Sequence, residues 1–314
     1  MKLPALSAGL LALAGLLPVS GGAAPVGIVT IAEGDLAIVR DAQRFAAAEG
    51  LRVREDDILR TSHDTRLARV ELADGSALDL GPDTELLLQP RAGGELGERA
   101  ATLYLARGWL KVSTPASLEG IASPVVDLRL LNGSAVLRVT DDGAFAFVES
   151  GRARIAAANG TREATPLAEG DSAVRRGRAP LETSRRLAPE LRQGLPRGFA
   201  DALPRRAARF QARPVEPSGG VPVSHAEVAT WIDGEPALRA LAVQRFASRA
   251  GDRQFRAALL AGARSHPEWE RVLFPEKSRP RPAVVVQRAE ARPVQLHGLM
   301  SWPLPDLDAT EATP

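Results

Sequence analysis

Short segments in which every second residue is apolar recur between residues 25 and 178, and turn residues separate them. Residues 68–72 alternate in this way before Asp74-Gly75, and residues 77–80 alternate after it. Period-two alternation predicts half-buried strands, and Asp-Gly between two such segments predicts a tight hairpin. Several turns at short intervals, with no helical period between them, are typical of an all-β unit. We therefore expect residues 25–178 to form a mainly β module, as a sandwich, a roll or a short β-helix.

The same pattern continues toward the end of this module. Residues 141–143 (Asp-Asp-Gly) are expected to turn the chain between two alternating segments, and residues 149–151 (Glu-Ser-Gly) are expected to turn it again. Residues 132–134 (Asn-Gly-Ser) also have the composition of a turn. Residues 33–40 and 169–176 share a Glu-Gly-Asp start followed by apolar residues, which hints at two related β layers.

Helical signals begin after residue 222. Ser224 and Glu227 have the spacing of a capping box, and Val223 and Val228 flank them as a hydrophobic staple would. Apolar residues at helical spacing then continue to about residue 275 and predict three short helices. We expect the core of this small helical region to include Trp231 and Trp269. Either Trp could alternatively form a platform for a carbohydrate.

The first 24 residues have the pattern of a secretory signal peptide. Lys2 precedes a short apolar segment that ends near Pro18, and small residues follow up to Ala24. The segment is short for a membrane-spanning helix, which needs ~20 apolar residues, although an uncleaved anchor is the alternative. We expect cleavage after Ala24, export to the periplasm or beyond, and no transmembrane anchor in the mature chain.

These patterns divide the chain into five expected parts. They are a signal peptide over 1–24, the β module over 25–178, a Pro- and Arg-rich connector over 179–222, a small α-helical region over 223–275 and a flexible Pro-rich tail over 276–314. Because the β pattern closes before the helical pattern begins, we expect residues 25–178 to fold alone. A fragment of these residues should give a β-type circular dichroism spectrum and melt cooperatively. An insoluble or unfolded fragment would mean that the helices belong to the same core.

Charge is distributed unevenly along the chain. Residues 1–174 contain 17 basic and 23 acidic side chains, a net charge of −6, whereas residues 175–314 contain 23 basic and 15 acidic, a net charge of +8. A basic half can contact nucleic acid, anionic lipid or acidic glycan, or be a solvated Arg-rich surface. Export makes a nucleic-acid partner unexpected. The absence of Cys excludes disulfides, thiol catalysis and zinc ribbons.

An ordered set of motifs resembles the FecR domain, the periplasmic module named after the ferric-citrate regulator. That family has a strand, a Gly-Asp-x-Leu-x-Thr step, a second strand, Asp-Gly-Ser, and a third strand that ends near Thr-x-Leu. The step is similar to residues 56–61, although Asp56 stands where the family usually has Gly. The residues that carry the resemblance are Gly34, Asp35, Asp57, Thr61, Asp74, Gly75 and Ser76.

The resemblance implies an extracytoplasmic β module that acts by binding. Members of the family transmit a signal from an outer-membrane receptor to a sigma factor through a cytoplasmic region and one transmembrane helix, and we expect both parts to be absent here. The seven motif residues are interpreted as structural, because Asp, Ser and Gly at turns bond or shape the local backbone. The alternative is a calcium loop that would use Asp56, Asp57, Asp79 and Asp83.

Catalytic motifs are absent from the sequence. The four His residues lack metal-ligand spacing, and no nucleophile elbow, phosphate-binding loop or dinucleotide fingerprint occurs. We therefore expect no catalytic, metal or cofactor site. The expected function is a non-enzymatic module that binds a periplasmic or outer-membrane protein, or an envelope glycan, with a role in signalling as one option. The alternative is an enzyme that acts on envelope polysaccharide or peptidoglycan.

Overall fold

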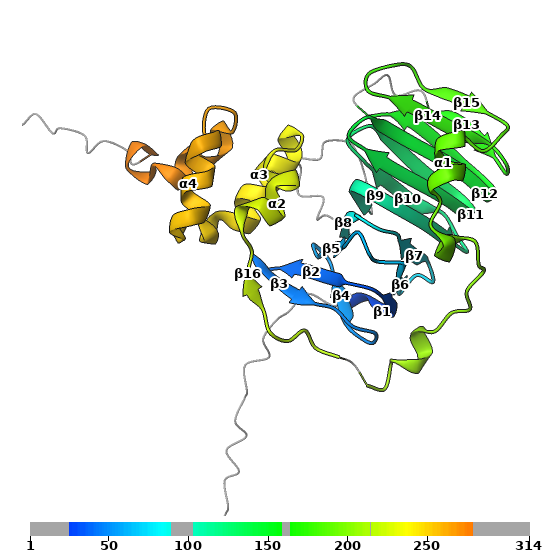
Figure 1. Ribbon diagram of the computed structural model, residues 1–314, viewed down its shortest axis with the longest axis horizontal. Coiled ribbons are helices and arrows are strands. Elements are labelled where there is room, and N and C mark those ends of the chain that lie inside the picture. The colour runs from blue at the N-terminus through cyan, green and yellow to red at the C-terminus, as the bar shows by residue number, and fades with distance from the viewer. Residues whose placement is uncertain (1–24, 89–102, 159–163, 214, 279–314) are drawn as a thin grey trace, which may run out of the picture. The chain divides into compact units, whose positions relative to one another are not determined.

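The computed structural model describes residues 25–88, 103–158, 164–213 and 215–278 (Figure 1). The expected signal peptide lies outside these ranges, as does nearly all of the expected tail. Within them the chain is mainly β up to residue 184 and helical at its end, which confirms the fold class predicted from the sequence. The division into independent parts is not tested by this arrangement and stays a prediction.

The β part is one open sheet with branches. Its main path runs in the order β15-β14-β12-β11-β10-β9-β8-β5-β2-β3-β16, and β1, β4, β6, β7 and β13 pair off this path. The strands of the first part are β1 (Pro25–Glu33), β2 (Leu36–Arg40), β3 (Gln43–Ala46), β4 (Arg52–Arg54), β5 (Ile58–Thr61), β6 (Leu67–Leu72), β7 (Ala77–Leu80) and β8 (Glu85–Leu88). The others are β9 (Leu103–Thr114), β10 (Leu118–Ala122), β11 (Val126–Thr140), β12 (Gly143–Ala157), β13 (Thr165–Ala168), β14 (Ser172–Arg176), β15 (Glu182–Ser184) and β16 (Val221–Pro222).

Two of the predicted hairpins are present. β6 and β7 pair with Val70 opposite Leu78, and Gly75 between them has a φ of 84°. β11 and β12 are joined at residues 141–142, as the Asp-Asp-Gly signal predicted. Their apolar side chains enter one hydrophobic cluster that extends from β1 to β14. Local turn chemistry therefore determines both hairpins.

Two predicted turns are wrong. Residues 132–134 and 149–151 lie inside the long strands β11 and β12, which pair from one end to the other. Gly133 lies opposite Gly151, with φ angles of 91° and 79°, and the register shifts on either side of Gly133. Glycine at positive φ occurs in β-bulges as well as in turns. Here the glycines bend two paired strands without reversing them.

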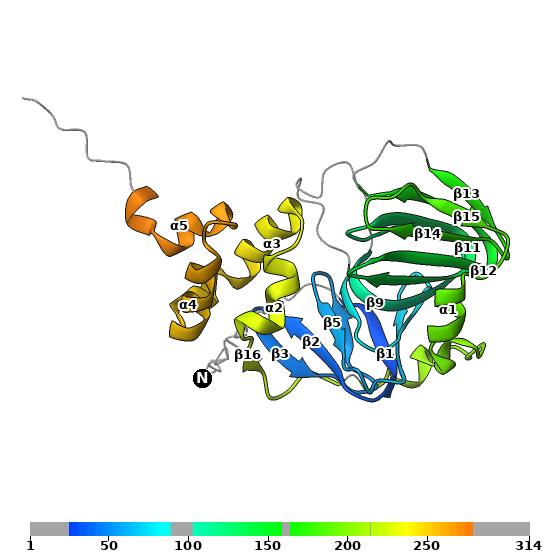
Figure 2. The same ribbon diagram turned by 45° about the horizontal axis from the view of Figure 1, so that its top comes forward.

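The connector after β15 covers one face of the sheet. It contains α1 (Pro189–Gly194) and the short 3-10 turns η1 (Arg197–Phe199) and η2 (Ala207–Arg209). Leu191 and Phe199 are buried in one cluster with Trp109, Val136 and Phe145 of the strands β9, β11 and β12. Figures 1 and 2 show α1 lying across this face.

The helical region consists of short elements that share one apolar cluster. They are α2 (His225–Ile232), α3 (Pro236–Phe246), η3 (Ala247–Gly251), α4 (Arg253–Gly262), η4 (Pro267–Trp269), α5 (Glu270–Leu273) and η5 (Pro275–Ser278). The predicted capping box is present, because the Glu227 carboxylate accepts hydrogen bonds of 2.8 Å from the backbone N–H and the hydroxyl of Ser224. Trp231 and Trp269 are 2% and 0% exposed, so they are core residues and not a carbohydrate platform.

This cluster also includes β residues, among them Val39, Ile58 and Leu87. None of the helices within the described ranges has the length and apolar character that a bilayer crossing needs.

The pH dependence of stability should reflect His225, the first residue of α2. Burial lowers the pKa of His225, and His266 lowers it further, while Asp233 opposes the shift. A protonated His at a helix N-terminus is also unfavourable. Because the unfolded chain binds this proton more readily, His225 leaves the stability of the fold unchanged above pH ~6.5 and destabilises the fold as the pH falls below that value. The melting temperature should drop more between pH 7.5 and 5.5 in the wild type than in His225→Gln. Trp fluorescence can follow both thermal melts. Equal drops in the melting temperature of the two proteins would contradict this role of His225.

Candidate functional site

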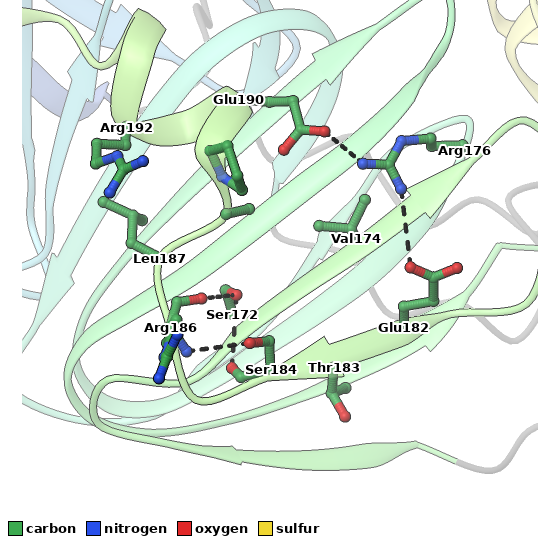
Figure 3. Close-up of a pocket in the computed structure, with 12 residues that line it drawn as sticks. Ser172, Val174, Arg176, Glu182, Thr183, Ser184, Arg186, Leu187, Glu190 and Arg192 are labelled. Carbon is green, nitrogen blue, oxygen red and sulfur yellow. Dashed lines mark hydrogen bonds and ion pairs between the residues drawn. The ribbon is translucent and has the colours of Figure 1, made fainter.

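An open pocket lies between β14, β15 and α1, at one edge of the sheet (Figure 3). Its volume is about 720 Å³, which is within the range of ligand sites. Ser172, Val174 and Arg176 line it because alternate residues of β14 point to the same face. The remaining lining comes from residues 182–184 of β15 and from the chain between Arg186 and Arg192.

Hydrogen bonds hold the chain between β15 and α1 against β14. The Ser172 hydroxyl donates to the backbone oxygen of Arg186 at 2.5 Å, and the Ser184 hydroxyl accepts from the Arg186 N–H at 3.2 Å. Pro189 then begins α1, where its fixed φ suits the first helical turn. Leu191 is buried under the helix. These contacts form one wall of the pocket.

Ion pairs neutralise the other wall. Arg176 pairs with Glu190 and lies 3.8 Å from the Glu182 carboxylate. The pKa of Glu190 is lowered by the hydrogen bond from its own backbone N–H and then by the bond from Arg176. Both carboxylates of the pocket therefore contact the same guanidinium.

Two cations of the pocket remain without an ion pair among the described residues. Arg186 and Arg192 are both exposed. Figure 3 shows them on either side of Leu187, away from Arg176. The unneutralised positive charge of the pocket is therefore concentrated on its Arg186 and Arg192 side.

The carboxyl groups and the Ser172 hydroxyl of the pocket already have partners. A glycoside hydrolase needs one carboxyl group whose pKa is raised so that it can donate a proton. Glu190 has the opposite shift, and none of the pocket residues is a His. The Ser172 hydroxyl donates to the Arg186 backbone oxygen, and a backbone carbonyl cannot act as the base that activates a nucleophile. In the part of the chain that the structure describes, no three acidic or His side chains are grouped as metal ligands would be.

The family-motif residues lie elsewhere and contact the backbone or the core. Asp57 is 1% exposed and accepts hydrogen bonds from Arg40 Nε and Nη2 at 2.8 and 2.7 Å. Its Oδ2 also accepts from the Arg54 N–H at 2.8 Å. The Thr61 hydroxyl donates to the Gly81 oxygen at 2.7 Å and accepts from the Thr84 N–H at 2.9 Å. These two residues connect strand ends to neighbouring turns by hydrogen bonds.

The other motif residues form tight turns. Gly34 has a φ of 115°, and Asp35 accepts at its backbone oxygen from the Thr65 hydroxyl at 2.8 Å. Asp74 accepts from the Ser76 N–H at 2.7 Å. The Ser76 hydroxyl donates to the Thr114 hydroxyl at 3.0 Å. Gly75 supplies the positive φ between them. None of the seven residues lines the pocket, and their interpretation as structural residues stays a prediction.

The calcium-loop alternative is wrong. Asp57 is bound to Arg40, and Asp79 is bound to Arg69 Nε and Nη2 at 2.5 and 2.7 Å. These carboxylates are both 1% exposed and already have cationic partners. Calcium would require several carboxylate or carbonyl oxygens around one free space.

A row of charged side chains is buried beneath the connector. Glu71 accepts hydrogen bonds from the backbone N–H groups of Arg206 and Ala207 at 2.8 and 3.1 Å. Arg69 donates to the Leu203 oxygen at 3.0 Å, and Lys111 donates to the Phe199 oxygen at 2.5 Å. Because these charges bind main-chain groups of the connector, they fix its position on the sheet.

No protein-family model matches this sequence, and no curated protein matches it. Among solved structures, it is similar to two crystal structures of a protein described as a candidate anti-sigma factor from Parabacteroides distasonis. The first has 11% identity and a TM-score of 0.35, and the match covers 43% of this chain and 62% of that one. The second has 13% identity and a TM-score of 0.35, with coverage of 44% and 64%. This chain thus spans less than two thirds of the length of the matched proteins. The low sequence identities and TM-scores carry no argument about function.

Sequence reasoning did not identify the pocket. The available signals were Arg185-Arg186 after a short strand and Arg192 in a Pro-started helix, within the basic half of the chain. These signals do not show that α1 packs back against β14. That packing depends on residues of β14, β15 and α1 together.

Proposed function

We propose that this protein is an exported, non-enzymatic binding module of the FecR type that recognises a protein partner through the pocket at β14, β15 and α1. The observation that carries the proposal is which charged side chains of that pocket have an ion-pair partner and which have none. Its carboxylates are bound to Arg176, whereas Arg186 and Arg192 have no ion pair among the described residues. A site with free cations and neutralised carboxylates is suited to binding and not to acid–base catalysis.

The FecR assignment is supported by the order of its motifs and by what their residues do. Asp57 and Thr61 bind neighbouring backbone groups, and Asp74-Gly75-Ser76 forms a hairpin turn. A module in which the motif is entirely structural has its binding function elsewhere. The pocket meets that requirement because none of the motif residues lines it.

Export is the part of the proposal that rests on the N-terminal sequence. If residues 1–24 are a cleaved signal peptide, N-terminal sequencing of the protein from the envelope fraction should begin at Pro25. An intact Met1 in that fraction would contradict cleavage.

Site-specific cross-linking tests the binding function. A photoreactive amino acid at Thr183, an exposed residue of the pocket lining, should capture one protein from an envelope extract. An excess of unmodified protein should abolish this adduct, and the purified partner should form it again. The matched control has the same amino acid at Gln254, an exposed residue of α4.

Assays on peptidoglycan and envelope polysaccharides test the enzymatic alternative. We expect no hydrolysis product above the background. Hydrolysis that disappears in Glu190→Gln would overturn the proposal, and so would equal adducts from Thr183 and Gln254.

A further inference from the structure

We infer that the pocket binds an acidic, extended segment of the partner protein, with a carboxylate at Arg186 and Arg192 and an apolar side chain on Val174 and Leu187. This inference rests on the proposed function, because it names the chemistry of the ligand at the same site. Three features of the pocket carry it: its free cations, its apolar floor and its position beside an edge strand.

The free cations lie on one side of the pocket. Arg186 and Arg192 flank Leu187, and Arg176 lies across from them with its two glutamates (Figure 3). A guanidinium donates paired hydrogen bonds that match a carboxylate, and its charge is not lost at neutral pH. Two such groups on one side favour a negatively charged group of the ligand there and nowhere else in the pocket.

The floor between the two charged sides is apolar. Val174 is buried, Leu187 is half-buried, and Ala188 and Pro189 continue the apolar surface toward α1. Apolar lining with a few polar groups at its edge is typical of sites that bind side chains of a ligand. A ligand that is charged along its whole length would gain nothing from this floor.

This composition favours a protein segment over a polyanionic glycan. A uniformly charged polymer would bring negative groups next to Glu182 and Glu190 as well as next to Arg186 and Arg192. Like charges at short range are unfavourable. A peptide can combine one or two carboxylates with apolar and neutral groups, so it can satisfy both walls of the pocket.

The edge strand favours an extended conformation of that peptide. The residues of β15 are exposed, and β14 is its sole partner among the described strands. An unpaired strand edge offers backbone N–H and C=O groups to an added strand. The peptide would then place every second side chain toward the pocket, which suits a sequence with an acidic and an apolar residue two positions apart.

Binding of a defined peptide tests this inference. The probe is a fluorescein-labelled hexapeptide, Ser-Glu-Ser-Leu-Ser-Glu, in which acidic and apolar residues alternate along one face of the extended chain. Its control has Gln in place of Glu. Fluorescence anisotropy with the full chain should show that the Glu peptide binds about tenfold or more tightly, because charge-assisted hydrogen bonds are lost with Gln. Added salt should weaken the binding of the Glu peptide.

Two double variants with the same net charge separate the pocket from general charge. Arg186→Gln with Arg192→Gln should weaken binding of the Glu peptide about tenfold or more. Arg178→Gln with Arg185→Gln removes two exposed cations outside the pocket lining and should leave binding nearly unchanged. Neither pair belongs to the core, so circular dichroism should show both variants folded.

Several results would overturn the inference. The inference is wrong if the Glu peptide does not bind the wild type, if the Gln peptide binds equally well, or if the two double variants lose binding equally. Dextran sulfate is the competitor that represents a polyanionic glycan. The inference is also wrong if dextran sulfate displaces the labelled peptide more effectively, per negative charge, than the unlabelled peptide does. The cross-linking experiment at Thr183 separates these failures from failure of the proposed function. If Arg186→Gln with Arg192→Gln still captures the partner as the wild type does, the binding function stands and the acidic-segment inference is wrong.

Discussion

Replacing Arg69 with Met should lower the free energy of unfolding by about 3–5 kcal/mol, because Asp79 would then be a buried charge without its partner. The two residues lie opposite each other in the β6–β7 hairpin, and Arg69 and Asp79 are 4% and 1% exposed. Two hydrogen bonds, of 2.5 and 2.7 Å, join the guanidinium to the carboxylate. Urea denaturation followed by circular dichroism measures the loss.

The double variant Arg69→Met with Asp79→Leu is the control. It removes the buried carboxylate together with its partner, and replacing a buried ion pair by apolar residues is often neutral. Both variants lose the hydrogen bond from Arg69 to the Leu203 oxygen, so the difference between them isolates the stranded charge of Asp79. We expect the double variant to recover most of the stability. A loss below about 1 kcal/mol in Arg69→Met would show that water reaches Asp79.

The hairpins could be predicted from the sequence because their signals are local. Asp74-Gly75 and the alternating residues around it specify both a turn and a face within about a dozen residues. The capping box of Ser224 and Glu227 is equally local, since both partners lie within one helical turn. Elements of this kind depend little on the rest of the fold.

The bulge at Gly133 and Gly151 could not be distinguished from two turns. Glycine at positive φ has the same sequence signal in either setting. The partner strand determines whether such a glycine lies in a bulge or in a turn. Here residues 126–140 pair with residues 143–157 on both sides of the glycines. That pairing is a property of two long segments and not of either Gly.

The buried charges and the pocket depend on contacts between distant segments. Arg69 and Glu71 alternate with apolar residues, which predicts a solvent-facing side of the strand, yet residues 199–207 cover them. Arg186 and Arg192 become neighbours of Val174 only when α1 returns to β14. Such contacts join residues that are far apart in the sequence. Glu71 and Arg206, for example, are separated by 135 residues.

Replacing Gly108 with Ala should cost about 2–5 kcal/mol, the sum of backbone strain and overpacking. Gly108 lies in β9 with a φ of 94°. A Cβ atom there would lie 2.6 Å from the Asp83 oxygen and 2.6 Å from the Thr84 hydroxyl oxygen. That hydroxyl accepts from the Trp109 N–H at 2.9 Å and is fully buried, so it cannot move away without breaking a hydrogen bond.

Gly75→Ala is the matched control for this variant. Gly75 also has a positive φ, 84°, but an added Cβ would meet only Pro115 Cγ, at an ordinary contact distance of 3.5 Å. Its cost should therefore be the backbone strain alone, about 1–2 kcal/mol. The difference between the two variants, measured by urea denaturation under the same conditions, reports the contact of β9 with Thr84. Equal losses would show that β9 shifts to relieve this contact and that the hydrogen bond of Thr84 to Trp109 does not hold it in place.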